Sequence, residues 1–109
     1  MKSNYRPLPV GLTIGNSPID GLGLIADEDF ESGYSFGITH VWLDNGEVIR
    51  TPLGGFINHS DKPNCKIIEC EAEKTRVVHA IRPIKKGEEI TVKYTLLIIY
   101  IRFKILFFI

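Results

Sequence analysis

The sequence predicts a single, mainly β domain. Short runs of β-branched and aromatic residues recur along the chain, and glycine, proline or polar turn residues separate them. No stretch has the apolar spacing of a long amphipathic helix. A chain of 109 residues has room for one modest core. We therefore expect one domain over residues 1–109, with its core at about 12–96.

The expected strands are short and closely spaced. The segments with strand-like patterns are 12–14, 24–26, 34–43, 48–51, 66–70, 75–80 and 89–94. The Asn45-Gly46 step predicts a tight hairpin between the third and fourth of these segments. The charged residues 71–74 predict a second hairpin between the fifth and sixth. This succession of hairpins is typical of a β-rich domain.

Charge and cysteine content narrow the classes of function. The 13 basic and 13 acidic side chains cancel, so no overall field attracts nucleic acid, and no nucleic-acid partner is expected. Cys65 and Cys70 are too few for the disulfide framework of a small secreted domain, and we interpret both as free thiols. The N-terminus lacks the apolar core of a signal peptide. We expect an intracellular protein, cytoplasmic or, in a eukaryotic cell, nuclear.

The C-terminal residues 97–109 are almost wholly apolar, with Arg102 and Lys104 as the charged exceptions. This tail is shorter than the roughly 20 residues that span a bilayer, so no membrane span is expected. Its alternating pattern after Ile99 favours a packed or partner-facing strand. A membrane-associating tail and a segment foreign to the domain are the alternatives. Self-association into a homodimer is one way for so small a domain to complete its core.

The stretch from Gly54 to Cys65 has the highest density of short polar side chains in the sequence. It reads Gly-Gly-Phe-Ile-Asn-His-Ser-Asp-Lys-Pro-Asn-Cys. Amides, an imidazole, a hydroxyl and a thiol gathered so closely indicate a site. Each of these residues alone also has a structural interpretation, because Asn58 and Asn64 can cap turns and His59 can be a buried hydrogen-bonding residue.

Three separated motifs together resemble the SET domain of protein-lysine methyltransferases. They are Gly21-Leu22-Gly23-Leu24, the Asn-His-Ser and Pro-Asn-Cys box of 55–65, and Gly-Glu-Glu-Ile-Thr-Val-Lys-Tyr at 87–94. The resemblance runs over about 12–96, as in a minimal, single-domain member. It implies a β-clip fold of small sheets, in which the last strand threads beneath a loop in a pseudoknot-like arrangement.

The resemblance also implies a cofactor, a substrate and site residues. The cofactor is S-adenosyl-L-methionine, and the substrate is a lysine side chain of a protein or peptide. The residues implied to bind the cofactor are Gly21, Leu22, Gly23, Asn58, His59 and Tyr94. Tyr94 is also the implied catalytic residue, facing the methyl group that is transferred. For the walls of the substrate channel, Phe56 is the first candidate because it adjoins the motif, and Tyr34 is the second.

Departures from the family pattern keep a second function open. The residue before the terminal tyrosine is commonly acidic in the family, and here it is Lys93. The insert that grips the peptide in larger relatives is reduced to about one hairpin. A catalytically inactive SET-like module that binds a peptide or protein is therefore the alternative to a methyltransferase.

Two other chemistries are not expected. His40, His59 and His79 fall on different predicted elements without a paired acidic cluster, so the sequence predicts no metal site. The family often shares zinc between the Pro-Asn-Cys cysteine and later cysteines, but none follows Cys70. Cys65 with His59 or His79 is an alternative nucleophilic pair. It is less favoured because Cys65 belongs to the Pro-Asn-Cys element, whose cysteine often serves in the family as a zinc ligand.

Overall fold

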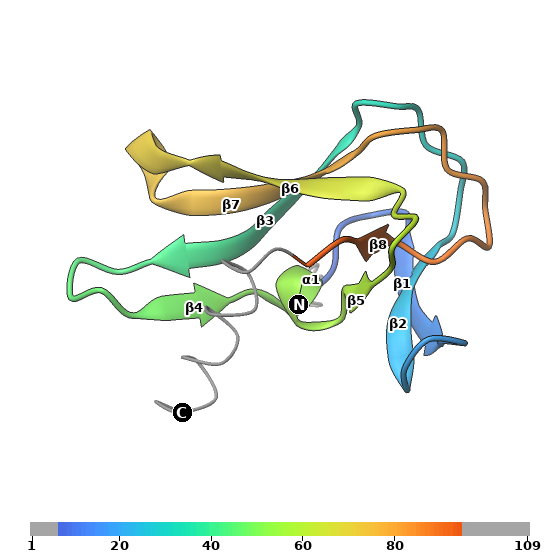
Figure 1. The fold of residues 1–109 in the computed structure, drawn as a ribbon, viewed down its shortest axis with the longest axis horizontal. Coiled ribbons are helices and arrows are strands. Elements are labelled where there is room, and N and C mark those ends of the chain that lie inside the picture. Colours follow the sequence, from blue (N-terminus) through green and yellow to red (C-terminus); the bar gives the residue numbers. More distant parts are fainter. Residues whose placement is uncertain (1–6, 95–109) are drawn as a thin grey trace, which may run out of the picture.

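The structure, a computed structural model, describes residues 7–94 and consists mainly of short strands in three small sheets (Figure 1). The first sheet is an antiparallel pair of β1 (Leu12–Asn16) and β2 (Leu22–Ala26). The mainly β fold class predicted from the sequence is confirmed. Both strands include their predicted segments, and β1 extends two residues further than expected.

The second sheet has four antiparallel strands in the order β4-β3-β7-β6. Its strands are β3 (Ser35–Trp42), β4 (Val48–Arg50), β6 (Cys65–Cys70) and β7 (Thr75–Ala80). The short 3-10 helix η1 (Glu71–Glu73) joins β6 to β7, and Lys74 after it adopts a left-handed conformation with φ +54°. Both predicted hairpins are therefore present, each within one or two residues of the expected bounds.

The β3–β4 hairpin closes differently from the turn that the Asn-Gly step suggests. Among the non-glycine residues 7–94, a positive φ occurs only at Lys74, so Asn45 is not left-handed. Gly46 alone takes a positive φ, and its N–H donates to the Leu43 carbonyl at 3.0 Å. The connection is a three-residue loop, in which glycine supplies the left-handed residue after a tight turn.

A one-turn helix, α1 (Pro52–Gly55), begins just before the polar stretch of 54–65, where the sequence predicts no helix. The hydroxyl of Thr51 accepts the Gly54 N–H at 3.2 Å, and proline occupies the first turn, where its missing N–H costs nothing. Leu53 turns into the core. The helix was not predicted because a single capped turn has no periodic apolar pattern.

The third sheet joins two segments far apart in the sequence. β5 (Asn58–His59) pairs in parallel with β8 (Thr91–Val92), with Asn58 opposite Thr91 and His59 opposite Val92. The strand predicted over 89–94 is therefore regular over only two residues. On either side its backbone groups find other partners, as when Ile90 donates its N–H to the Leu24 carbonyl at 2.8 Å.

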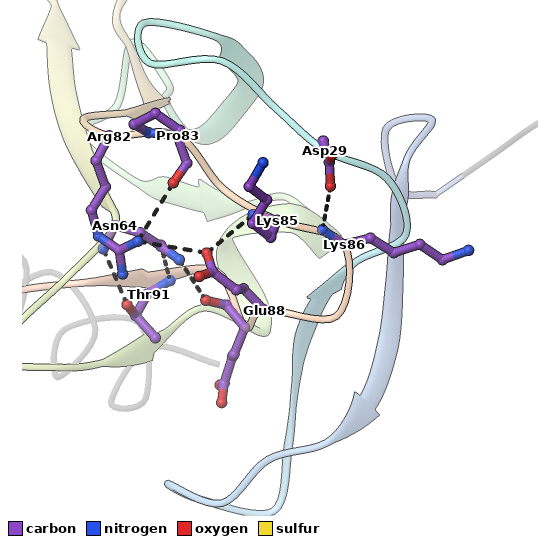
Figure 2. A network of polar contacts seen from close by, with 9 residues as sticks. Asp29, Asn64, Arg82, Pro83, Lys85, Lys86, Glu88 and Thr91 are labelled. Carbon is purple, nitrogen blue, oxygen red and sulfur yellow. Dashed lines mark hydrogen bonds and ion pairs between the residues drawn. The ribbon is translucent and has the colours of Figure 1, made fainter.

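Asn64 holds this C-terminal segment from the opposite side. Its Nδ2 donates to the Glu89 carbonyl at 2.8 Å, and its Oδ1 accepts the Thr91 N–H at 2.9 Å. Figure 2 shows the Asn64 side chain against Thr91, beside the loop that carries Glu88. Segment 89–92 thus runs between β5 and the residue that precedes β6, as expected for the threaded arrangement that the resemblance implies.

The core lies on one face of the four-stranded sheet, and segment 89–94 and both small sheets contribute to it. Its fully buried members include Leu24, Val78, Ile84, Ile90 and Val92. The other face of this sheet carries Ile38 and Ile68, which both pair with Val77 of β7 and are both more than 40% exposed.

No helix within residues 7–94 is long and apolar enough to cross a membrane. Self-association stays a prediction, and the apolar tail of 97–109 lies outside the described residues.

Gly54→Ala is expected to destabilise the fold by about 2 kcal/mol or more, because overpacking against a fixed backbone costs this much. A Cβ at Gly54 would stand 2.3 Å from the carbonyl oxygen of Thr39, which is backbone and cannot rotate away. Gly55→Ala is the matched control, since no atom lies within 4 Å of the position of its Cβ. Its effect is expected to be below about 1 kcal/mol. Urea unfolding of both variants tests this, and equal stability would contradict it.

Asn64→Ala is expected to lower the free energy of unfolding by about 2–4 kcal/mol, because it leaves the buried N–H of Thr91 and the partly buried carbonyl of Glu89 without their partner. The side chain is 2% exposed and bonds both Glu89 and Thr91. Asn45→Ala makes the same chemical change in an exposed turn, where the side chain accepts one N–H. Denaturant titration is expected to show at most about 1 kcal/mol of loss for this control.

Candidate functional site

Tyr94 is fixed by the segment that contains the Asn-His pair. Its hydroxyl donates to the Ile57 carbonyl at 2.7 Å, and its backbone N–H donates to Nδ1 of His59 at 2.8 Å. The rings of His59 and Tyr94 lie 5.2 Å apart between centroids. The parallel pairing of β5 with β8 brings these residues together, although 35 positions separate them in the sequence.

His59 serves as a support for Tyr94. Because Nδ1 accepts a backbone N–H, the neutral ring carries its hydrogen on Nε2. Nε2 lies 3.2 Å from Oδ1 of Asp61, whose carboxylate is a suitable acceptor. Both ring nitrogens are therefore engaged within the chain, and this geometry argues for a positioning role instead of proton transfer.

The amide of Asn58 has an unambiguous orientation. The two hydrogens of its Nδ2 are shared among four acceptors: Oγ of Ser17 (3.1 Å), the carbonyls of Asp20 and Leu22 (3.2 Å each) and Oε2 of Glu89 (2.8 Å). A rotated amide would place Oδ1 against two carbonyls and a carboxylate, which cannot donate. Oδ1 of Asn58 accepts no hydrogen bond from residues 7–94 in the contacts described, so it is the side of the amide that is left for a ligand.

The Gly-x-Gly motif lies beside Asn58, at the start of β2. Gly21 has φ +45°, a conformation that favours glycine, and no atom lies within 4 Å of the place its Cβ would occupy. Leu22 is about half exposed, and its carbonyl accepts a hydrogen bond from Nδ2 of Asn58. Gly23 is different, because a Cβ there would stand 2.3 Å from Oε2 of Glu89. Of the two glycines of this motif, Gly21 is therefore the one whose backbone is open on the side where a side chain would be.

Of the two residues predicted for the channel wall, Phe56 lies closer in the chain to the site. Phe56 ends α1, one residue before Ile57, and packs against the core, as does Tyr94. Tyr34 packs instead against Phe30 and Phe36, at centroid distances of 4.8 and 5.0 Å. It lines a shallow cavity formed by residues 28–34, none of which is another predicted site residue. No contact described for residues 7–94 joins Tyr34 to Tyr94, so its channel role stays a prediction.

Cys65 is unsuited to nucleophilic catalysis. The side chain is 1% exposed, and burial raises the pKa of the thiol to about 12, an effect that the charge of Arg82 partly offsets. A thiol with this pKa stays protonated near neutral pH, whereas the reactive form is the thiolate. Within the described range 7–94, no three His, Cys, Asp or Glu side chains are grouped so that they could hold a metal ion.

Two residues of this site were not singled out from the sequence, Ser17 and Glu89. Glu89 stands inside the Gly-Glu-Glu-Ile motif, but no role was assigned to it. Ser17 lies in the turn after β1 and carries no motif at all. Only the fold shows that both side chains meet Asn58, because the three residues come from separate parts of the chain.

Comparison with known proteins identifies the family. The model of the SET domain matches residues 24–95, which is well over half of the chain and includes the Asn-His box and Tyr94. The chain belongs to the SET domain family. The β-clip fold class expected from the resemblance is thereby confirmed, since the matched region includes β3 through β8 and the last three residues of β2.

Two curated relatives are identical to this SET domain at about two fifths of the aligned positions. The human histone-lysine N-methyltransferase 2B is 37% identical over 73 residues, which is 62% of this chain and 3% of that protein. The H3 lysine-4 specific histone-lysine N-methyltransferase of Chaetomium globosum is 44% identical over 68 residues, which is 58% of this chain and 6% of that protein. The chain thus spans a small fraction of these relatives.

Solved structures agree on the SET fold. A crystal structure of a Plasmodium falciparum protein proposed to be a histone methyltransferase superposes with a TM-score of 0.64 and 24% identity, covering 79% of this chain and 94% of that one. A chain of an active polycomb repressive complex 2 superposes with a TM-score of 0.63 and 22% identity, covering 79% of this chain and 15% of that one. At these identities the likeness concerns the fold alone.

The raised pKa of Cys65 predicts a loss of stability at alkaline pH. Between pH 9.0 and about 12 the thiol ionises in the unfolded chain but stays protonated in the folded one. The unfolded state therefore binds fewer protons, and stability falls as pH rises through this window. In Cys65→Ala this contribution is absent, so the stability difference between wild type and variant is expected to shrink from pH 8 to pH 10.5. Urea unfolding at both pH values measures it, and a constant difference would contradict it.

Proposed function

We propose that this chain is a protein-lysine N-methyltransferase that uses S-adenosyl-L-methionine. The observation that carries the proposal is the fixation of Tyr94 by Ile57 and His59, next to the oriented amide of Asn58. Residues 57–59 therefore hold Tyr94, which is proposed for catalysis, and include Asn58, which is proposed to bind the cofactor. Family membership and the names of the curated relatives support the same activity.

The donor and acceptor set fits the methionine part of this cofactor. Its ammonium group needs acceptors, and Oδ1 of Asn58 is an acceptor held in one orientation by the bonds to Nδ2. The open backbone of Gly21 allows a ligand to approach closely. We propose that Gly21, Leu22, Gly23, Asn58 and His59 surround the cofactor, with Gly23 acting through the packing of Glu89. When bound, the cofactor supplies a methyl group on a positively charged sulfur, which keeps the electron pair of the broken C–S bond.

Tyr94 would orient the attacking amine. Because its hydroxyl hydrogen is donated to Ile57, the phenol can offer an incoming amine only the acceptor side of its oxygen. An N–H of a neutral lysine amine directed to this oxygen leaves the nitrogen lone pair to point at the methyl carbon. The lysine arrives as an ammonium group and would lose one proton to solvent before attack, because both nitrogens of His59 are engaged. Catalysis then rests on alignment more than on acid–base power.

The substrate is proposed to be a lysine of a protein, because the curated relatives are named histone-lysine N-methyltransferases. Between β4 and β5 this chain has only α1 and two linking residues, so it lacks room there for a large peptide-gripping insert. An intracellular location stays a prediction. Lys93, the departure before Tyr94, is exposed and does not intrude on the core.

The test combines cofactor binding with methyl transfer. Calorimetric titration with S-adenosylhomocysteine, which needs no substrate, is expected to show micromolar binding in wild type, about −8 kcal/mol. Asn58→Ala is expected to lose it. Tyr94→Phe is expected to keep binding within a few-fold but to lower radiolabelled methyl transfer to histone H3 peptides by about 100-fold.

Three outcomes decide between the functions. Full transfer by the Asn58→Ala, Tyr94→Phe double variant would refute the proposed mechanism. Peptide binding without transfer by the wild-type chain would favour the catalytically inactive binding module. A folded wild-type chain that binds no S-adenosylhomocysteine would contradict the cofactor assignment itself.

A further inference from the structure

Glu89 and Ser17 form a closed triangle of hydrogen bonds with Asn58. Oγ of Ser17 donates to Oε1 of Glu89 at 2.7 Å, and Nδ2 of Asn58 donates to Oε2 of the same carboxylate at 2.8 Å. The third side is the bond from Nδ2 of Asn58 to Oγ of Ser17 at 3.1 Å. The three residues belong to the turn after β1, to β5 and to the segment before β8.

The direction of every bond in the triangle is determined. An ionised carboxylate only accepts, so the Ser17 hydroxyl hydrogen must point to Glu89. Oγ of Ser17 then has lone pairs for Asn58 and for the backbone N–H of Ile19, which it accepts at 3.0 Å. The turn after β1 thereby orients Ser17, and Ser17 together with Glu89 orients the amide of Asn58.

The second glycine of the Gly-x-Gly motif makes room for this triangle. A Cβ at Gly23 would stand 2.3 Å from Oε2 of Glu89 and 3.0 Å from Nδ2 of Asn58. Any side chain at this position would therefore displace the carboxylate from the amide. The requirement for glycine at 23 is thus explained by the bond between Glu89 and Asn58.

We propose that Glu89, supported by Ser17, is the positioning residue that turns Oδ1 of Asn58 toward the ammonium group of the cofactor. A charged acceptor on Nδ2 both prevents rotation of the amide and polarises it, which strengthens Oδ1 as an acceptor. The inference rests on the proposed function and goes beyond it, because Glu89 acts on cofactor affinity without touching the cofactor. Tyr94 and its hydroxyl are not part of the triangle.

Calorimetric titration of the full chain with S-adenosylhomocysteine tests the proposal. Glu89→Ala is expected to weaken binding by about tenfold or more, since a hydrogen bond to a charged group is lost. Glu89→Gln is expected to restore affinity to within about threefold of wild type, because its amide oxygen can still accept from Nδ2 of Asn58, although the bond from Ser17 is lost. If Glu89 only stabilised the fold, the affinities of Glu89→Ala and Glu89→Gln for S-adenosylhomocysteine would not differ in this way while both variants stay folded.

Two comparisons separate positioning from general damage. Glu88→Ala is the matched control, because it removes the adjacent carboxylate, which lies 3.6 Å from Arg82 and accepts the Lys85 N–H (Figure 2) and is not among the bonding partners of Asn58. This control is expected to bind like wild type. In an Asn58→Ser background, Glu89→Ala is expected to lower the remaining affinity by less than about twofold, because the two residues act through one group.

The outcomes distinguish the two proposals. If wild type binds S-adenosylhomocysteine but Glu89→Ala binds equally well, the positioning role is wrong and the proposed function stands. Equal losses in Glu89→Ala and Glu88→Ala would also refute the positioning role. If folded wild type does not bind at all, the proposed function fails together with the inference built on it.

Discussion

The attachment of segment 89–94 to the Asn58–Asn64 region is the interaction on which the rest of the site depends. Two residues of parallel strand pairing would be a weak connection alone, and the bonds from Asn64 reinforce it from the other side. Ile90 and Val92 are at the same time fully buried members of the core. Backbone pairing, side-chain clamping and apolar burial therefore act on the same few residues.

This arrangement explains how so small a domain can hold a site rigidly. Tyr94 follows directly after the clamped residues, and both its hydroxyl and its N–H are bonded to the β5 region. For a displacement reaction that needs alignment, the accuracy of the reacting geometry depends on such supports. The imidazole of His59 could in other settings transfer a proton, but in this site it accepts the backbone N–H of Tyr94 and so helps to fix that residue.

The glycines of the chain show how one residue type serves different constraints. Gly21 allows a positive φ beside open space, whereas Gly23 and Gly54 allow close packing against Glu89 and the Thr39 backbone. These requirements cannot be distinguished in the sequence, where each position reads simply as glycine. The spatial neighbour decides whether glycine is needed for its backbone freedom or for its missing Cβ.

The fold class, most of the strands and the family resemblance can be predicted from the sequence alone, because alternation, turn residues and the Asn-His and Gly-Glu-Glu-Ile motifs are local patterns. The sequence also pointed to Asn58, His59 and Tyr94 as one group through the resemblance. Tertiary structure alone decided that the predicted strand 89–94 is regular over two residues, that α1 caps the polar stretch, and that Glu89 faces Asn58. These features depend on partners that lie 31 or more residues away or on a single capped turn, and a periodic pattern carries no information about either.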